Sequence, residues 1–342
     1  MRLLVTGAAG FIGSNFVRLA LRELPGTPIA ILDALKYSGR RSTMADLLSH
    51  KEVEFVHGAI EDDAMVKSVY DGFKPTHVVN FAAESHNDRS LGDPYGFARS
   101  NFWGPLVLFN EARGRDIERI VQVSTDEVYG SIDEGVFTED SPFLANSPYS
   151  AAKAGGDLMA RAFWKTYKLP IVVTHGGNTY GPWHYPEKLI PFFVTRLLDK
   201  KKVPLYGEGH QVREWIHVMD HARGVLTAML KGENGGVYNV GDTNEHRNTD
   251  VVNLLLQELG LDESYIKKIP DPRQGAHDAR YSMATDRIRA LGWSPAMPFE
   301  QSLRETVQWF KDNEPWWREI QSDPQYQQFI TAFYGKSLGS DL

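Results

Sequence analysis

A glycine-rich turn near the amino terminus constrains the fold of this chain more than any other feature. An apolar segment at residues 2–5 suits a buried strand, and the pattern G-x-x-G-x-x-G follows it before an amphipathic helix that should reach about residue 23. Glycine lets the backbone turn sharply and approach a pyrophosphate at the helix amino terminus, although a tight turn without a ligand is the alternative. The turn residues expected to contact a dinucleotide are Gly7, Gly10, Phe11, Ile12 and Gly13.

A carboxylate ends the next expected strand. Residues 29–32 are apolar, and Asp33 follows them, twenty residues after Gly13. A carboxylate in this position can accept hydrogen bonds from the adenosine ribose hydroxyls and would repel a 2′-phosphate. The spacing therefore favours NAD over NADP, with a strand-end cap as the alternative.

Strands and helices continue to alternate through the first half of the chain. Further strands are expected at 53–56, 77–81, 120–123 and 169–173, with long helices at about 94–113 and 149–168. Repeated β-α units with apolar strands are typical of a doubly wound parallel sheet. The predicted fold class is therefore α/β, with a Rossmann-type sheet.

The sequence changes character after residue 174. Glycines and prolines crowd a loop-rich stretch, a strand at 237–241 should return to the sheet, and helices are expected at about 190–199, 248–259 and 299–313. This pattern predicts a smaller, discontinuous carboxyl-terminal substrate lobe over the strand ends. The expected division is 1–175 with about 215–245 for the NAD-binding domain, 176–214 and 246–330 for the lobe, and 331–342 for a tail.

Composition excludes several classes of protein. Lys and Arg number 37 against 44 Asp and Glu, so the net charge of −7 indicates neither a nucleic-acid nor an anionic-membrane surface. The absence of cysteine excludes disulfides, thiolate metal sites and a cysteine nucleophile. No signal peptide is expected before the first strand, and no apolar run approaches the roughly 20 residues that span a bilayer. We expect a cytoplasmic protein.

The strand at 120–123 leads into the residues that carry the predicted chemistry. Thr125, Asp126 and Glu127 follow it, and ligands of open α/β sheets bind at the carboxyl ends of the strands. Farther on, Tyr149 and Lys153 are four residues apart and share one helix face. A lysine ammonium beside a phenol should lower the phenol pKa, making Tyr149 a usable base. A capping or surface acidic pair is the alternative for the two carboxylates.

These features resemble the extended short-chain dehydrogenase/reductases that act on nucleotide sugars, and within them the dTDP-glucose 4,6-dehydratases. The resemblance covers residues 1 to about 310 and includes Ala-Ala-Glu-Ser-His at 82–86, Ser-Thr-Asp-Glu-Val-Tyr-Gly at 124–130 and Tyr-Pro-Glu-Lys-Leu-Ile-Pro at 185–191. The adjacent Asp126 and Glu127 discriminate most, because related epimerases and decarboxylases do not normally carry both carboxylates.

The resemblance implies a mechanism. Tyr149 would take the proton of the sugar 4-hydroxyl while hydride leaves C4 for NAD, with Lys153 on the nicotinamide ribose and Thr125 near the 4-oxygen. Glu127 would then remove the C5 proton, and a protonated Asp126 would donate to the departing 6-hydroxyl. Hydride would return to C6, giving a 4-keto-6-deoxy sugar nucleotide.

The resemblance also implies contact residues. Besides the glycine turn, Asp33, Tyr149 and Lys153, the NAD contacts would be Ile60, Ala82 and Asn178. The nucleotide-sugar contacts would be Ser85, Asn178, Glu187, Lys188, Arg213, Asn248, Arg273 and Tyr281.

Four segments of the chain depart from the family pattern. Ala59 stands where an aspartate usually bonds the adenine, which should weaken adenine anchoring. Asn87 replaces a usual valine, and His-Gly-Gly at 175–177 replaces a usual Arg-Cys/Gly-Ser/Asn run. The turn from Arg273 to His277 is one residue longer than usual. These changes leave the nucleotide base and the sugar open, with UDP-glucose as an alternative.

Other functions stay open. A nucleotide-sugar 4-epimerase or decarboxylase would keep Tyr149 and Lys153, and a non-catalytic NAD or nucleotide-sugar binding module could keep the fold. No metal is expected, because the chemistry needs none. The resemblance implies a homodimer, and the two long helices, at about 94–113 and 149–168, could pair across its two-fold axis.

Overall fold

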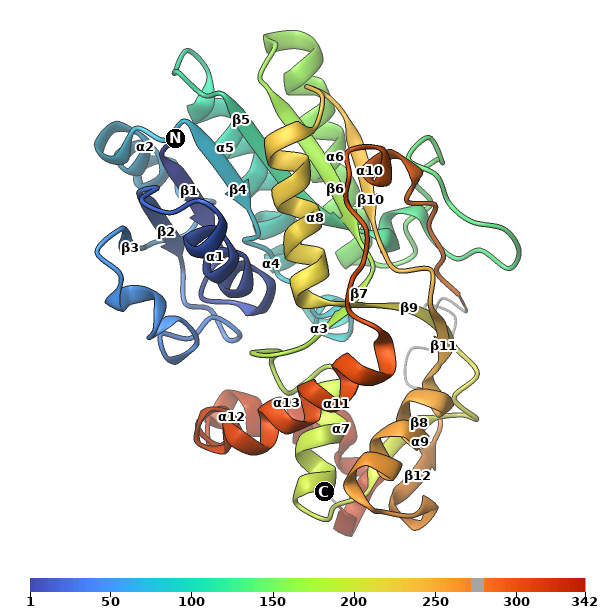
Figure 1. The fold of residues 1–342 in the computed structure, drawn as a ribbon. Coiled ribbons are helices and arrows are strands. Elements are labelled where there is room, and N and C mark those ends of the chain that lie inside the picture. Colours follow the sequence, from blue (N-terminus) through green and yellow to red (C-terminus); the bar gives the residue numbers. More distant parts are fainter. Residues whose placement is uncertain (272–279, 342) are drawn as a thin grey trace.

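The computed structural model describes residues 1–271 and 280–341. Its largest element is a seven-stranded sheet in which each strand runs parallel to its neighbours (Figure 1). The strands are, in spatial order, β3 (Val53–His57), β2 (Ile29–Asp33), β1 (Leu3–Thr6), β4 (His77–Asn80), β5 (Arg119–Thr125), β6 (Ile171–Gly176) and β10 (Val237–Val240). The order reverses between β1 and β4, and this switch point confirms the predicted doubly wound sheet.

Helices cover both faces of this sheet. Leu3 and Val5 of β1 pack into one apolar core with α1 (Phe11–Glu23) and α8 (Val218–Lys231). Leu4, between them, points to the opposite core, as alternation along a strand requires. That second core is formed with the helices α2 (Asp63–Phe73), α5 (Gly104–Ala112) and α6 (Pro148–Tyr167). Burial on both faces explains why the strands are continuous apolar runs.

The predicted helix at 94–113 is one helical run with an irregular centre. It consists of α4 (Pro94–Ala98), a π-helical turn at Arg99–Trp103, and α5. A short helix, α3 (Asn87–Gly92), precedes it and was not predicted. The run packs against α6, so the two long helices of the sequence prediction lie side by side.

The rest of the chain builds a further apolar core below the strand ends, the carboxyl-terminal core (Figure 1). Two small sheets, in the orders β11-β9-β7 and β12-β8, accompany it. The additional strands are β7 (Asn178–Tyr180), β8 (Val203–Tyr206), β9 (Val212–His217), β11 (Glu245–Arg247) and β12 (Ile266–Ile269). The additional helices are α7 (Leu189–Leu198), α9 (Asn248–Leu259), α10 (Asp286–Ala290), α11 (Phe299–Asp312), α12 (Glu314–Gln321) and α13 (Pro324–Leu338).

Two expectations for this part of the chain need correction. Arg213 falls in no helix or strand expected from the sequence, but it lies in β9, where β7 and β11 flank it. The aromatic segment after residue 315 had no predicted element, yet it forms α12 and α13. Trp317 and Tyr334 are buried in the carboxyl-terminal core, because these helices turn their aromatic side chains inward.

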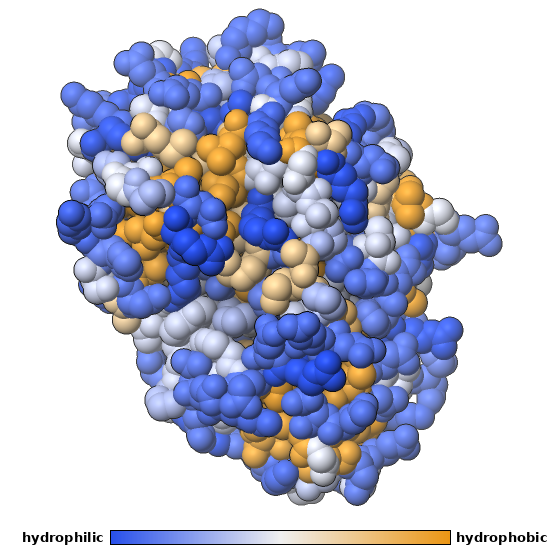
Figure 2. All heavy atoms as spheres, viewed as in Figure 1, coloured by the Kyte–Doolittle hydropathy of each residue, from blue (hydrophilic) through white to orange (hydrophobic). Residues whose placement is uncertain are grey.

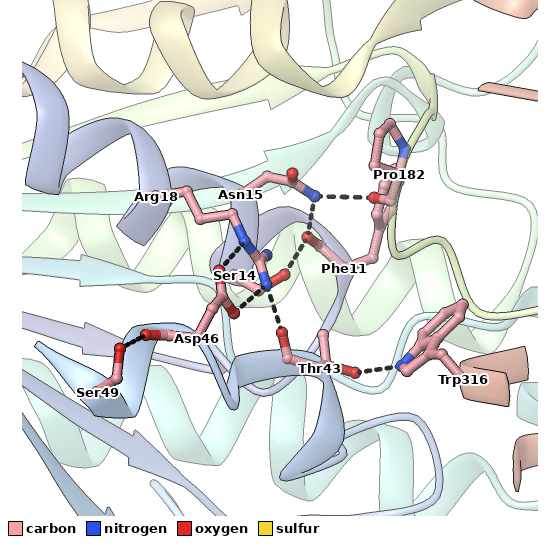
Figure 3. Close-up of polar contacts among 9 residues, drawn as sticks. All are labelled: Phe11, Ser14, Asn15, Arg18, Thr43, Asp46, Ser49, Pro182 and Trp316. Atoms are coloured by element: carbon pink, nitrogen blue, oxygen red, sulfur yellow. Dashed lines mark hydrogen bonds and ion pairs between the residues drawn. The ribbon is translucent and has the colours of Figure 1, made fainter. Parts of the chain in front are cut away.

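Contacts from the amino-terminal helix join the two halves of the chain (Figure 3). Asn15 Nδ2 on α1 donates hydrogen bonds to the carbonyl oxygens of Phe11 (2.9 Å) and Pro182 (3.0 Å). The Trp316 indole of α12 donates to Thr43 Oγ1 at 3.2 Å. The glycine turn is thereby fixed relative to the carboxyl-terminal helices. Figure 2 shows that this face is mainly hydrophilic, with apolar side chains exposed in separate groups.

Candidate active site

Two adjoining cavities lie at the carboxyl ends of the large sheet. One follows the glycine turn, and the other, of about 270 Å³, extends from the end of β5 toward the carboxyl-terminal core. Eight residues line both cavities, so the two form a continuous space: Phe11, Ile12, Ser85, Ser124, Tyr149, His184, Glu187 and Lys188. This position is the one at which open α/β sheets bind ligands.

The first cavity gathers the residues expected at a dinucleotide. Its lining includes Gly7, Gly10, Phe11, Ile12, Gly13, Asp33, Ile60, Ala82, Tyr149 and Lys153. Gly7 has φ +73°, and a Cβ there would lie 2.4 Å from the Ala82 nitrogen. A Cβ on Gly13 would lie 2.5 Å from the Gly7 oxygen, so only glycine lets α1 pack this closely on the turn.

Asp33 lines this cavity and accepts hydrogen bonds from two backbone amides. Its Oδ2 accepts a hydrogen bond from the Ala9 nitrogen (2.9 Å) and its Oδ1 accepts one from the Leu35 nitrogen (2.8 Å). Burial raises the pKa of Asp33, while these amides oppose the rise. Because each carboxylate oxygen has two lone pairs, Asp33 keeps acceptor capacity for ribose hydroxyls.

Tyr149 and Lys153 occupy the first turns of α6. Ser147 caps this helix by accepting a hydrogen bond from the Ser150 nitrogen, and Pro148 is its first residue. The cap sets the helix start so that Tyr149 lies over the end of β5, where both cavities meet. Lys153 is 5% exposed, and its Nζ donates to the Val123 carbonyl at 2.6 Å.

The expected effect of Lys153 on Tyr149 is not what the structure shows. Burial, followed by the charge of Glu127, raises the pKa of Tyr149, and only a hydrogen bond with Thr125 opposes the rise. Burial also lowers the pKa of Lys153 to about 8. The pKa of Tyr149 is therefore raised in this structure, opposite in direction to the lowering expected from the sequence, because desolvation dominates at this buried phenol.

The three residues after the β5 apolar run form the base of the second cavity. Asp126 opens a 3₁₀ turn that ends at Tyr129, and Thr125 caps it by accepting from the Glu127 nitrogen at 3.3 Å. The Thr125 hydroxyl donates to Asp126 Oδ1 at 3.1 Å. Burial, and then the neighbouring charge of Glu127, raises the pKa of Asp126 to about 8. Asp126 is thus a proton donor at neutral pH beside a second carboxylate.

The opposite wall of the second cavity comes from the carboxyl-terminal half of the chain. It contains Asn178, Glu187, Lys188, Arg213, Asn248 and Tyr281. The Arg213 guanidinium is 5% exposed and lies 4.5 Å from the Tyr281 ring centroid. Among the described residues, Oδ1 of Asn178 and Oδ1 of Asn248 are buried without a hydrogen-bond partner, which fits a ligand that carries donors. Arg273 lies outside the described residues.

Glu187, Lys188 and Ser85 lie between the two cavities. Lys188 Nζ donates to the Ser85 carbonyl at 2.7 Å. Glu187 is buried, and its Oε2 accepts from Arg89 Nε at 2.9 Å. Burial raises the pKa of Glu187, while Arg89 opposes the rise.

Several lining residues were not predicted. His184 lines both cavities and stacks on Phe11, with ring centroids 4.1 Å apart. His221 lines the second cavity, and burial lowers its pKa to about 4. Asn87, singled out only as a departure from the family, donates from Nδ2 to Glu127 Oε2 at 2.8 Å. No local spacing marked the two histidines as cavity residues, because His184 lies on a loop and His221 on α8, and these distant segments meet only in the fold.

His217 and His221 have the four-residue spacing that suits a metal pair on a helix, but His217 accepts from the Met219 nitrogen and His221 bonds Thr179 Oγ1. In residues 1–271 and 280–341, no group of three potential ligands could hold a metal ion. No helix within the same residues is both long and apolar enough to cross a membrane.

Comparison with known proteins places these residues in a family context. The family model for GDP-mannose 4,6-dehydratase matches residues 4–306. A dTDP-glucose 4,6-dehydratase from Streptomyces niveus is 46% identical over 327 residues, which cover 94% of this chain and 96% of that protein.

Solved structures agree with this relationship. A dTDP-glucose 4,6-dehydratase from Streptomyces venezuelae, solved with NAD bound, is 44% identical and superposes with a TM-score of 0.90, covering 94% of this chain and 100% of that chain. A UDP-glucose 4-epimerase from Thermus thermophilus, solved in complex with NAD, is 31% identical with a TM-score of 0.84, covering 92% of this chain and 100% of the epimerase.

Proposed function

This chain belongs to the GDP-mannose 4,6-dehydratase family, and from that premise we propose that it is an NDP-hexose 4,6-dehydratase with dTDP-glucose as its substrate. The observation that carries the proposal is the meeting of Tyr149, Asp126 and Glu127 at one cavity wall, next to a second cavity built on the glycine turn. The curated relative at 46% identity bears the same activity in its name.

NAD is the cofactor that the first cavity fits. The close glycine turn would hold the pyrophosphate, Asp33 the adenosine ribose and Lys153 the nicotinamide ribose, with Ile60, Ala82 and Asn178 as further contacts. When bound there, NAD would supply the hydride acceptor for the oxidation at C4 and the hydride donor for the reduction at C6. Since Ala59 has no carboxylate, we infer weaker anchoring of the adenine.

Tyr149 opens the reaction by taking the proton of the 4-hydroxyl as C4 is oxidised, a role that requires its phenolate. Burial alone keeps the phenol protonated, and the positive charge of an NAD nicotinamide bound in the cavity that Tyr149 lines would favour the phenolate. The 4-ketone then acidifies the C5 proton, which Glu127 removes, and Asp126 protonates the 6-hydroxyl as it leaves as water. These two roles require Asp126 to be protonated while the neighbouring Glu127 is ionised. The pKa of Asp126, raised to about 8 by burial and by Glu127, supports that assignment.

Thr125 lies between Asp126, the proposed acid, and Tyr149, the proposed base for the 4-hydroxyl. Its hydroxyl is hydrogen-bonded with Tyr149 and donates to Asp126 Oδ1. After elimination Tyr149 has gained one proton and Asp126 has lost one, so this chain of oxygens offers a route that restores both groups. Glu127 returns its proton to C5 when the hydride reaches C6.

The second cavity would hold the nucleotide sugar. We assign its sugar end to Ser85, Asn178, Glu187 and Lys188, and its diphosphate end to Arg213 and Asn248, with Tyr281 beside Arg213. Arg273, which the resemblance adds to the diphosphate contacts, lies outside the described residues. A buried guanidinium suits a diphosphate because it stays charged and offers several donors.

A 4-epimerase is the second candidate, because an epimerase shares this fold at 31% identity. A 4-epimerase or a decarboxylase would need Tyr149 and Lys153 but would have no use for an acid–base pair at C5 and C6. The intact set of Thr125, Tyr149 and Lys153 weighs against a binding module without activity.

The division of the chain into two domains differs from the expected one only at the carboxyl terminus. We propose residues 1–175 with about 215–245 as the NAD-binding domain, and 176–214 with 246–330 as the nucleotide-sugar lobe. Tyr334 and Leu338 are buried in the core of that lobe, so we join residues 331–341 to it.

We further propose a cytoplasmic homodimer. The helical run 94–112 and α6 lie side by side and expose large apolar side chains, with Tyr95 82% and Leu158 58% exposed. Pairing of these helices across a two-fold axis would cover them. The chain has no cysteine and so forms no disulfide, and this composition suits the reducing environment of the cytoplasm. A single monomeric species in sedimentation at micromolar concentration would contradict the dimer.

The test is mass spectrometry of protein incubated with dTDP-, UDP-, GDP- and CDP-glucose in ordinary and deuterated water. Loss of one water from dTDP-glucose alone, with one deuterium gained at C5, is the expected result. The same outcome from UDP-glucose would keep the mechanism and change the substrate. An unchanged mass with all four would reject dehydration, and an epimerised product would support the second candidate.

A further inference from the structure

Asn87 makes a direct contact with one of the proposed catalytic carboxylates. It is the first residue of α3, and its Nδ2 donates to Glu127 Oε2 at 2.8 Å. Both side chains line the cavity proposed for the nucleotide sugar. The backbone of Asn87 is itself fixed, because Ser90 Oγ donates to its carbonyl oxygen at 2.6 Å.

This contact is a departure from the family pattern. A valine is usual at position 87 in the resembling dehydratases, and a valine side chain has no donor for a carboxylate. An amide donor stabilises the charged form of a carboxylate and restricts its rotation. The effect falls on the residue that would remove the C5 proton.

We propose that Asn87 is a positioning residue for the elimination step: its amide holds the Glu127 carboxylate ionised and oriented toward C5. This inference rests on the proposed dehydratase function. It predicts that C5 deprotonation persists to lower pH here than it would with the usual valine.

The charged groups around Glu127 act differently from this amide. Asp126, on the same turn, and Tyr149, on α6, both interact with the Glu127 charge, but neither is a cation. On α3, Asp88 Oδ2 lies 3.8 Å from His86 Nδ1. Across the cavity, Lys188 donates to the Ser85 carbonyl, and the Arg213 guanidinium lies over Tyr281 while its charge acts on Asp126.

The experiment compares the wild-type enzyme with Asn87→Val and Asn87→Asp across pH, using dTDP-glucose with hydrogen or deuterium at C5. With Asn87→Val, the acid limb of kcat should move up by about one pH unit, and the C5 isotope effect should rise, because a hydrogen bond to a charged group is lost. Asn87→Asp should move the limb farther through like-charge repulsion. KM should change less than about twofold, since this contact is made to Glu127.

Asn253→Val, a matched change on the exposed surface of α9, should keep the wild-type profile. Thermal unfolding of each variant shows whether it is folded. The inference is overturned if Asn87→Val keeps the acid limb and the isotope effect, or if it raises KM alone, which would make Asn87 a sugar contact. A wild-type enzyme that dehydrates no nucleotide sugar would instead reject the proposed function.

Discussion

Lys153 Nζ donates a 2.6 Å hydrogen bond to the carbonyl oxygen of Val123, two residues before Thr125. This bond joins α6 to the end of β5, so the two segments that carry the proposed chemistry are held together by the lysine itself. Burial lowers the pKa of Lys153 to about 8, and the nearby Asp157 opposes the decrease.

Replacing this lysine should therefore affect both position and charge. We expect Lys153→Met to lower kcat/KM by about 10²-fold or more, because the nicotinamide ribose loses its proposed partner and α6 loses its link to β5. NAD affinity should fall as well. Steady-state kinetics and calorimetric titration with NAD measure the two effects. Activity within a few-fold of wild type would contradict the assignment of Lys153.

Asp126→Asn should separate oxidation from elimination. The amide cannot give a proton to the leaving hydroxyl, so we expect kcat to fall by about 10²- to 10⁴-fold while C4 oxidation continues. Nicotinamide absorbance after rapid mixing with dTDP-glucose should rise and persist. Rapid decay of that signal would show that Asp126 is not the acid.

The same variant should change the dependence of stability on pH. The Asp126 carboxyl has a pKa of about 8 in the folded protein against an ordinary value of 3.8, so between these values the folded state binds the proton that the unfolded state has lost. The stabilisation that this bound proton provides is fully present below pH 3.8, and it is lost as the pH rises through about 8. The asparagine side chain of the variant does not titrate, so the Tm difference between the variant and wild type should grow in the variant's favour from about pH 6 to about pH 9. A constant difference would contradict the raised pKa.

Local patterns were sufficient to predict the large sheet. The apolar runs, the glycine turn and Asp33 act within one β-α-β unit, where spacing alone fixes which side chains meet at the strand ends. The pairing of Tyr149 with Lys153 likewise follows from one helical turn.

The carboxyl-terminal core could not be predicted in the same way. Arg213 lies in a strand because β7 and β11, from distant segments, pair with β9, and no local pattern records that pairing. The raised pKa of Tyr149 was missed for a related reason, since spacing reveals a neighbouring lysine but not the desolvation that outweighs it.

The glycine turn can be tested against a glycine that has similar backbone geometry. Gly7→Ala should lower the free energy of unfolding by more than about 2 kcal/mol and weaken NAD binding, because φ is +73° and the new Cβ would lie 2.4 Å from the Ala82 nitrogen. Gly26 has φ +77° with nothing within 4 Å, so Gly26→Ala should cost only about 1 kcal/mol and leave NAD binding unchanged. Equal effects in urea unfolding would contradict the close packing of the turn.

The neighbouring glycines at the end of β6 should respond unequally to substitution. A Cβ on Gly176 would lie 2.3 Å from His221 Cε1 and 2.6 Å from its Nε2. His221 is fixed by its 2.7 Å hydrogen bond with Thr179 Oγ1, so Gly176→Ala should displace the ring and lower the free energy of unfolding by about 1–3 kcal/mol. KM for the nucleotide sugar should also rise, since Gly176 and His221 line its cavity.

Gly177→Ala is the matched control. The nearest atom to its new Cβ is the Glu214 carbonyl oxygen at 3.5 Å, an ordinary contact, so the free energy of unfolding should stay within about 0.5 kcal/mol of wild type. Urea unfolding of the two variants side by side measures the difference. If both alanines are tolerated equally, His221 has room to move, and the glycine at 176 is not required by its packing.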